Sequence, residues 1–208
     1  MWALVEDNAI VKIINNPKAM VIGDTRHSRN IFSSRWTNAE REAIGIYEIV
    51  FDNSNKRDEA YYINTNQSFD FADGVATASF GSATAKLLED RNEVDEAGEP
   101  LLDDNGNQVV TKGLKSQKKE IIKQQASGLL EPTDWYNHKA LDDATFTIPA
   151  NITTFRSDVR TKSNTMETAI DNASDVDALA TLYEYVNTGT EENPVMERPL
   201  GEFPTLEI

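Results

Sequence analysis

The chain has 208 residues, with 20 Lys and Arg against 35 Asp and Glu, and a formal net charge of −15. This acid excess argues against a nonspecific nucleic-acid binder and against docking on anionic lipid, because both need a basic face. The absence of cysteine excludes disulfide frameworks, thiolate metal sites and cysteine nucleophiles. Hydrophobic residues make up 39%, below the usual ~45–50%, so we expect a modest core divided between small units.

Residues 1–88 predict a β-rich docking domain with one short helix. Two short apolar runs flank a polar turn within the first residues, which is typical of a β-hairpin. Thr37 and Glu40 have the spacing of a capping box, so we expect a short helix from Asn38 that stops at Gly45. The other expected strands are 19–22, 46–51, 61–63, 68–71 and 75–80, the last two joined by a turn at Asp73-Gly74.

Residues 89–113 predict an acidic hairpin connector. Eight acidic residues and one arginine lie between Glu89 and Asp104. Two Asp-x-x-Gly tetrapeptides, 95–98 and 103–106, suit type I turns. We therefore expect a three-stranded meander or a pair of hairpins, and no internal repeat is evident.

Residues 114–188 predict an antiparallel helical domain, and residues 189–208 an extended tail without regular structure. A first helix is expected from Leu114 to Gly128, followed by a loop through Pro132 and Tyr136. The longest helix opens at Pro149 and the last is capped by the segment 174–177. The apolar residues of these two helices are Ile152, Phe155, Val159, Met166 and Ile170, then Val176, Leu179, Leu182, Tyr183 and Val186. The fold class is therefore α+β.

The search for catalytic chemistry is negative, and we predict a protein that is not an enzyme and holds no cofactor. The sequence has no glycine-rich phosphate loop and none of the common hydrolase or metalloprotease motifs. His27 and His138, the two histidines, are better explained as surface or packing residues. Calcium binding by the connector is an alternative, because its turns are rich in oxygen ligands. The spacing does not match an EF-hand loop, so solvated turns are favoured over a metal site at Asp95, Glu96, Asp103, Asp104 and Asn105.

No apolar run approaches the ~18–20 residues of a membrane span, and no signal peptide is evident at the N-terminus. We therefore expect a soluble protein that contacts neither membrane nor nucleic acid. It would remain in the cytoplasm or be assembled into a particle from there.

Two arginines on the predicted long helix, Arg156 and Arg160, have two interpretations. They can form ion pairs on a solvent-facing surface, which contribute little to stability. Alternatively, Arg156 pairs with Asp134 and fixes the loop beside Trp135, since an arginine can pair with a carboxylate and stack on an aromatic ring. The proline-rich tail around Phe203 packs in a groove of its own chain or of a partner.

Two stretches resemble proteins of tailed bacteriophages. The first runs through Trp2–Val5, Ile31–Ser33, Trp36–Glu40 and Ala43–Val50, and resembles small proteins encoded beside phage tail-fibre genes. The second comprises a Leu-Leu…Thr-Asp-Trp segment at 129–135, then an aromatic-Arg-x-x-x-Arg helix at 155–160. This second stretch resembles the phage tail assembly chaperone family, with Phe203-Pro204 in place of the family's Trp-Pro.

This resemblance implies a non-enzymatic bacteriophage tail protein, a structural or adaptor component associated with the tail fibre or baseplate. The alternative it leaves open is a tail-fibre assembly chaperone that is not retained in the virion. The expected partners are tail-fibre or baseplate proteins, and a homo-oligomer stays open. The expected location is the virion tail, with assembly in the host cytoplasm. The residues expected to bind a partner or to form a structural clamp are Asp134, Trp135, Arg156, Arg160 and Phe203, with Trp135 buried in the core.

Overall fold

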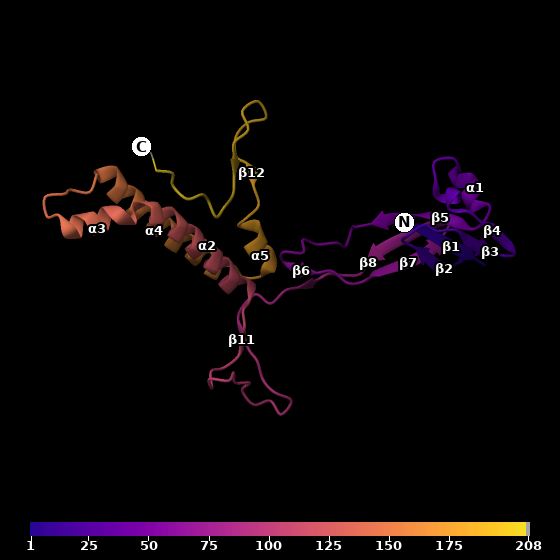
Figure 1. Ribbon diagram of the computed structural model, residues 1–208, viewed down its shortest axis with the longest axis horizontal. Helices are drawn as coiled ribbons and strands as arrows, with labels where there is room; N and C mark the ends of the chain where they lie inside the picture. The colour runs from indigo at the N-terminus through magenta and orange to yellow at the C-terminus, as the bar shows by residue number, and fades with distance from the viewer. Residues whose placement is uncertain (207–208) are drawn as a thin grey trace. The chain divides into compact units, whose positions relative to one another are not determined.

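The computed structural model describes residues 1–206 and has the predicted α+β fold (Figure 1). The chain divides into two compact units. The first, which we call the β unit, is Met1–Thr84. The second, the helical unit, begins at Ala85 and contains the ranges predicted as connector, helical domain and tail.

The β unit is built on a five-stranded sheet with the order β2-β1-β5-β8-β7. β5 and β8 pair in parallel, whereas β1 pairs antiparallel with both β2 and β5, and β7 antiparallel with β8. The elements from the first residue onward are β1 (Trp2–Glu6), β2 (Ala9–Ile14), β3 (Met20–Ile22), β4 (Thr25–His27), η1 (Arg29–Phe32), α1 (Asn38–Glu42), β5 (Ile46–Asp52), β6 (Tyr62–Ile63), β7 (Gln67–Ala72), β8 (Val75–Phe80) and β9 (Thr84–Ala85).

The two predicted hairpins, β1–β2 and β7–β8, are confirmed. The backbone conformation of their turns explains why these strands pair. Asp7 and Asn8 have φ of 49° and 60° between β1 and β2, and Asp73 and Gly74 have φ of 51° and 78° between β7 and β8. Two consecutive positive φ angles give a turn whose twist matches that of paired strands, and Asp, Asn and Gly tolerate them best.

Both faces of the sheet bury apolar side chains, so the core of the β unit is split. One cluster contains Ala3, Val5, Ile49, Ala76 and Ala78, with partly buried aromatic and aliphatic residues around it. The other contains Leu4, Ile14 and Ile46. Its partly buried neighbours are Trp2, Met20, Ile22, Phe32 and Ile44.

The predicted capping box of α1 is confirmed. The Thr37 hydroxyl accepts a hydrogen bond from the Glu40 N–H, and the Glu40 carboxylate accepts one from the Thr37 N–H at 2.7 Å. Hydrogen bonds from the Thr37 N–H and hydroxyl to the Glu40 carboxylate lower the pKa of Glu40. Gly45 follows the helix with φ of 80°, and a Cβ atom there would lie 2.7 Å from the Val5 carbonyl oxygen. Only glycine fits this position, which explains the stop.

The helical unit is built on an antiparallel pair of long helices, α2 and α4. Its remaining elements are shorter. In chain order the elements are β10 (Arg91–Asn92), β11 (Val110–Thr111), α2 (Leu114–Leu130), η2 (Glu131–Thr133), α3 (Asp134–Asp142), α4 (Ala150–Asp171), α5 (Val176–Thr181), β12 (Val186–Asn187) and β13 (Met196–Glu197). The predicted apolar stripe of α4 is confirmed, because Ile152, Phe155, Val159, Met166 and Ile170 are all buried.

Four predictions about the secondary structure of residues 114–206 are wrong. α2 continues past Gly128 to Leu130, because a single glycine reduces but does not abolish helix propensity. The predicted loop at 132–136 is helical, forming η2 and the start of α3. The last helix ends at Thr181, and Val186 lies in strand β12. The tail is not wholly irregular, because β13 pairs with β12 in a short hairpin.

The acidic connector folds as a pair of hairpin turns on a short stem of β10 and β11, one of the two expected forms. The Asp95 carboxylate accepts hydrogen bonds from the N–H groups of residues 97 and 99. Asp103, eight residues later, accepts equivalent bonds from residues 105 and 107. The two Asp-x-x-Gly tetrapeptides thus form equivalent turns, and the segments 94–100 and 102–108 share only this Asp and Gly.

The two turns join through a ring of three backbone hydrogen bonds. The Leu101 N–H donates to the Glu93 carbonyl at 3.0 Å, Val109 to Leu101 at 2.8 Å, and Glu93 to Val109 at 2.9 Å. Nε2 of Gln108 lies 2.7–3.1 Å from all three carbonyl oxygens. One side-chain amide thus contacts the three chain segments that meet at the junction. We call residues 91–111 the double hairpin.

Candidate functional site

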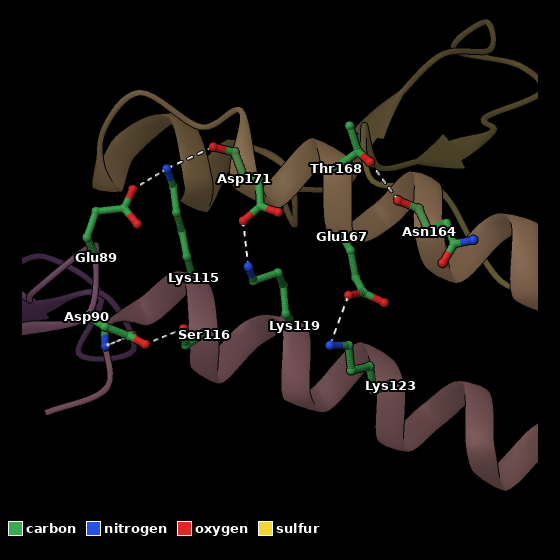
Figure 2. A network of polar contacts seen from close by, with 11 residues as sticks. Glu89, Asp90, Lys115, Ser116, Lys119, Lys123, Asn164, Glu167, Thr168 and Asp171 are labelled. Carbon is green, nitrogen blue, oxygen red and sulfur yellow. Dashed lines mark hydrogen bonds and ion pairs between the residues drawn. The ribbon is translucent and has the colours of Figure 1, made fainter. Parts of the chain in front are cut away.

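The α2–α4 pair that carries the site is held by a row of lysines on α2 (Figure 2). Lys115, Lys119 and Lys123 lie four residues apart and so share one face of the helix. Lys115 donates to the Asp171 carbonyl oxygen at 2.9 Å, and Lys119 to the Asp171 carboxylate at 2.7 Å. Lys123 pairs with Glu167 at 3.3 Å. The Asp171 carboxylate raises the pKa of Lys119, so this lysine stays charged.

The start of α2 is fixed by two acidic residues that precede the double hairpin. Asp90 accepts hydrogen bonds from the Gly113 N–H at 2.8 Å and the Ser116 hydroxyl at 2.9 Å. It thereby holds the residue before the helix and the third residue of the helix, while the N–H groups of Leu114 and Lys115 donate to the carbonyls of Leu87 and Leu88 at 2.8 and 3.1 Å. The hydrogen bonds from Gly113 and Ser116 lower the pKa of Asp90. Glu89 pairs with the buried Lys115 at 2.5 Å. The double hairpin is thereby tied to the helix at its base.

Arg156 forms the clamp predicted as one of two interpretations. Its Nη2 lies 2.7 Å from a carboxylate oxygen of Asp134. Its Nη1 donates to the Leu130 carbonyl at 2.9 Å and to the Thr133 hydroxyl at 2.5 Å. The Arg156 side chain is 9% exposed and that of Asp134 51%. The guanidinium therefore joins the end of α2, the η2 turn and the start of α3 to α4.

Arg160 lies one helical turn after Arg156 and is exposed. Its Nη1 contacts the Arg156 carbonyl oxygen at 3.2 Å. Within residues 1–206, Arg160 has no carboxylate within ion-pair distance. Both arginines line a groove of about 490 Å³ between α2, the start of α3 and α4. We call this the cationic groove, and its lining residues are Lys123, Ala126, Ser127, Leu130, Asp134, Arg156, Arg160, Ser163 and Asn164.

The groove thus collects three of the five predicted site residues: Asp134, Arg156 and Arg160. Phe203 lies outside it and packs, with Leu206, on the buried cluster of Ala126, Phe155 and Val159. The tail therefore packs on its own chain, on the α4 side that includes Asn151 and Asp158.

The expectation that Trp135 is a core residue is wrong. Its side chain is 50% exposed, and it stacks on Tyr136 with ring centroids 3.8 Å apart. The reason is that α3 buries none of its residues, and the rings beside Trp135 are those of its neighbour Tyr136 and of Phe146 in the loop that follows α3. Trp135 does not line the cationic groove.

Sequence reasoning missed Thr133 and Lys123 as members of the site. Thr133 is buried, with its hydroxyl donating to the Leu130 carbonyl and accepting from Arg156. Thr133 belongs to the Thr-Asp-Trp segment. A threonine directly before an acidic residue is a common start of a helix, and this pattern could have identified Thr133. Lys123 could have been found from the four-residue lysine spacing.

The other candidates considered for chemistry have structural explanations. Asp95 and Asp103 are engaged by backbone N–H groups at the tips of the double hairpin. Across residues 1–206, no group of three or more His, Asp or Glu side chains could hold a metal ion. His27 lies against Trp36 with ring centroids 6.3 Å apart, and His138 is exposed on α3.

The groove offers guanidinium, ammonium, hydroxyl and amide donors beside the apolar side chains of Ala126 and Leu130. Such a donor set suits the binding of an oxygen-rich group by hydrogen bonds. In the part of the chain described, no helix has the length and apolarity needed to cross a membrane. Comparison with protein-family models, curated proteins and solved structures found no match.

Proposed function

We propose that this protein is a non-enzymatic component of a bacteriophage tail, a structural or adaptor protein associated with the tail fibre or baseplate. Its function would be protein–protein contact, with the helical unit binding a partner through the cationic groove. It would be assembled in the host cytoplasm and retained in the virion tail.

The observation that carries this proposal is the meeting of two sequence segments in one clamp. The phage-like pattern comprises a Leu-Leu…Thr-Asp-Trp segment and an Arg-x-x-x-Arg helix, separated by about 20 residues. Asp134 from the first pairs with Arg156 from the second at 2.7 Å, and Leu130 and Arg160 line the same groove. The residues on which the resemblance depends thus act together, which supports a shared function for them.

A second candidate is the tail-fibre assembly chaperone. It is favoured by the resemblance of the second stretch to the tail assembly chaperone family, and by the exposed apolar side chains of α3. Trp135 is 50% exposed and Leu141 83% exposed. Both residues lie on α3, and exposed apolar side chains provide contact area for another protein.

Quantitative mass spectrometry of purified virions separates the two candidates. Particles of the phage that encodes the chain are purified by density gradient, and the chain is quantified against a known tail protein. A fixed ratio that persists through a second gradient supports the structural role. Presence in the infected-cell lysate with absence from the particles would reject that role and support the chaperone. Host cytoplasmic proteins serve as the control for carry-over.

A further inference from the structure

We infer that the cationic groove binds a carboxylate from an acidic peptide segment of the partner, with Arg160 as its principal ligand. The inference rests on the proposed function, because it names the chemistry of the partner at the same site. It follows from which hydrogen bonds and ion pairs the cationic side chains of the groove already make.

The three cationic side chains of the groove differ in how many of their N–H donors already bind groups of the same chain. Arg156 is buried and donates to three groups of its own chain. Lys123 is 65% exposed and pairs with Glu167 at 3.3 Å. Arg160 is exposed, and its one contact with the described residues is to the Arg156 carbonyl. A guanidinium has five N–H donors, so Arg160 keeps an edge available for two parallel bonds to a carboxylate.

Arg160 differs from the arginines that have an acidic side chain within reach. Arg198 pairs with Glu202, and Arg91 with Glu93. Arg160 instead has Arg156 one helical turn before it and lines the same groove as Lys123. The nearby carboxylates of Asp134 and Glu167 pair with Arg156 and Lys123, which leaves the charge of Arg160 in excess. A local excess of positive charge in an acidic protein is complementary to a negative group from elsewhere.

The rest of the lining indicates a peptide as the source of that carboxylate. Ser127 on α2 and Asn164 on α4 provide neutral hydrogen-bonding groups, which suit a peptide backbone. Ala126 and Leu130 provide an apolar surface for a neighbouring side chain. A volume of about 490 Å³ lies within the ~300–1,000 Å³ of known ligand pockets. A short segment with glutamate or aspartate beside leucine matches these features.

The tail of the chain shows how such a segment packs on this helix pair. Phe203 and Leu206 pack on the buried cluster of Ala126, Phe155 and Val159. Ala126 belongs both to this cluster and to the lining of the cationic groove. The tail therefore lies beside Asn151 and Asp158 of α4, whereas the groove is lined by other residues of α4, among them Arg156 and Arg160.

The test is a titration of the purified full chain, followed by ¹H–¹⁵N NMR of backbone amides and arginine Nε–H groups. The probe is a short capped peptide with two central glutamates between leucines, and the comparison peptide has glutamines at those positions. Physiological salt screens charges beyond ~8 Å, so the net charge of the protein has little influence. We expect saturable shifts at residues of the groove with the glutamate peptide and none with the glutamine peptide.

Two variants assign the effect to the groove. Arg160→Gln should weaken binding of the glutamate peptide by about tenfold or more, because it removes charge-assisted hydrogen bonds. Arg35→Gln is the matched control, since Arg35 is exposed in the β unit and the charge change is the same. It should leave binding unchanged.

The inference is overturned if the glutamate peptide gives no saturable shift, or if Arg160→Gln and Arg35→Gln bind it equally. An unchanged dispersion of the amide spectrum in Arg160→Gln would show that this variant remains folded. If the peptide does not bind but the chain is present in virions, the carboxylate ligand is rejected and the proposed function stands. If the peptide binds but the chain is absent from virions, the proposed structural role is rejected and the carboxylate ligand stands.

Discussion

The substitution Arg156→Met tests the clamp that forms the cationic groove. Methionine retains much of the aliphatic length of arginine but removes three hydrogen bonds from a buried cation. Each such bond to a charged group contributes about 1.5–3 kcal/mol. The total loss is smaller than their sum for two reasons. The Leu130 carbonyl keeps the Thr133 hydroxyl as a donor, and Asp134 is half exposed and regains water. We therefore expect a loss of about 2–3 kcal/mol in the free energy of unfolding.

Two further variants divide this loss among its causes. Asp134→Asn removes the ion pair alone and should cost about 1 kcal/mol, since a half-exposed partner is partly solvated. Arg160→Met is the matched control, because it makes the same change on the same helix at an exposed position. It should cost no more than about 0.5 kcal/mol.

Urea denaturation followed by circular dichroism at 222 nm measures these effects. The long helices α2 and α4 belong to the helical unit, so this signal reports mainly on that unit. Equal losses for Arg156→Met and Arg160→Met would refute the reasoning, because burial and hydrogen bonding would then make no difference. A loss for Asp134→Asn as large as that for Arg156→Met would assign the clamp to the ion pair rather than to the Leu130 and Thr133 contacts.

Three other predictions follow from burial and hydrogen bonding. Trp135→Ala should lower the free energy of unfolding by less than about 1 kcal/mol, and Phe155→Ala by about 3–5 kcal/mol, as measured by the same urea experiment. Gln108→Ala should speed the hydrogen exchange of the amides in the three-bond ring, measured by NMR, while α4 amides keep their protection; unchanged exchange would contradict the role given to Gln108. Asp90 has a folded pKa below its ordinary 3.8, so it stabilises the fold above that pH and loses this contribution as the pH falls below it. Asp90→Asn should therefore reduce stability at pH 7 and flatten its decline in acid, and an equally steep decline in urea midpoint would contradict this.

Local patterns predicted the elements of the β unit well. Capping boxes, turn residues and alternating apolar positions depend on neighbours within a few residues, and each was present at the expected place. The sheet order was beyond such reasoning. The parallel pairing of β5 with β8 depends on contacts between residues 49–52 and 76–79, which no local pattern encodes.

In the helical unit, the failures arose where tertiary contacts override local signals. The segment 132–136 contains a proline and polar residues, which favour a loop, yet Arg156 holds it as helical turns by contacts 22–26 residues away in sequence. The partner of Arg156 could be proposed because Asp134 stands beside a tryptophan in a short motif. The groove itself could not, because its walls come from α2, α3 and α4, whose packing the sequence does not specify.

Each unit buries one arginine whose guanidinium donates to backbone carbonyls. These hydrogen bonds help each unit to hold an irregular segment although its apolar core is modest. Arg41 in α1 donates to the carbonyls of Ile31 at 2.8 Å and Ser33 at 2.6 Å, at the end of η1. Arg156 in α4 donates to the carbonyl of Leu130, the last residue of α2. Carbonyl groups at the C-terminal ends of helices and helical turns lack partners within the helix, and burying them unpaired costs stability.

One guanidinium can satisfy several such groups because its donors point in fixed directions from a single plane. A lysine could satisfy them only by turning a flexible chain. In the β unit the guanidinium also stacks on Trp2 at 4.7 Å, so the whole side chain is enclosed and no edge is left to contact a ligand. In the helical unit the clamp lies in an open groove, with Arg160 one turn away. The same structural device therefore lies in a closed core in one unit and lines an open groove in the other.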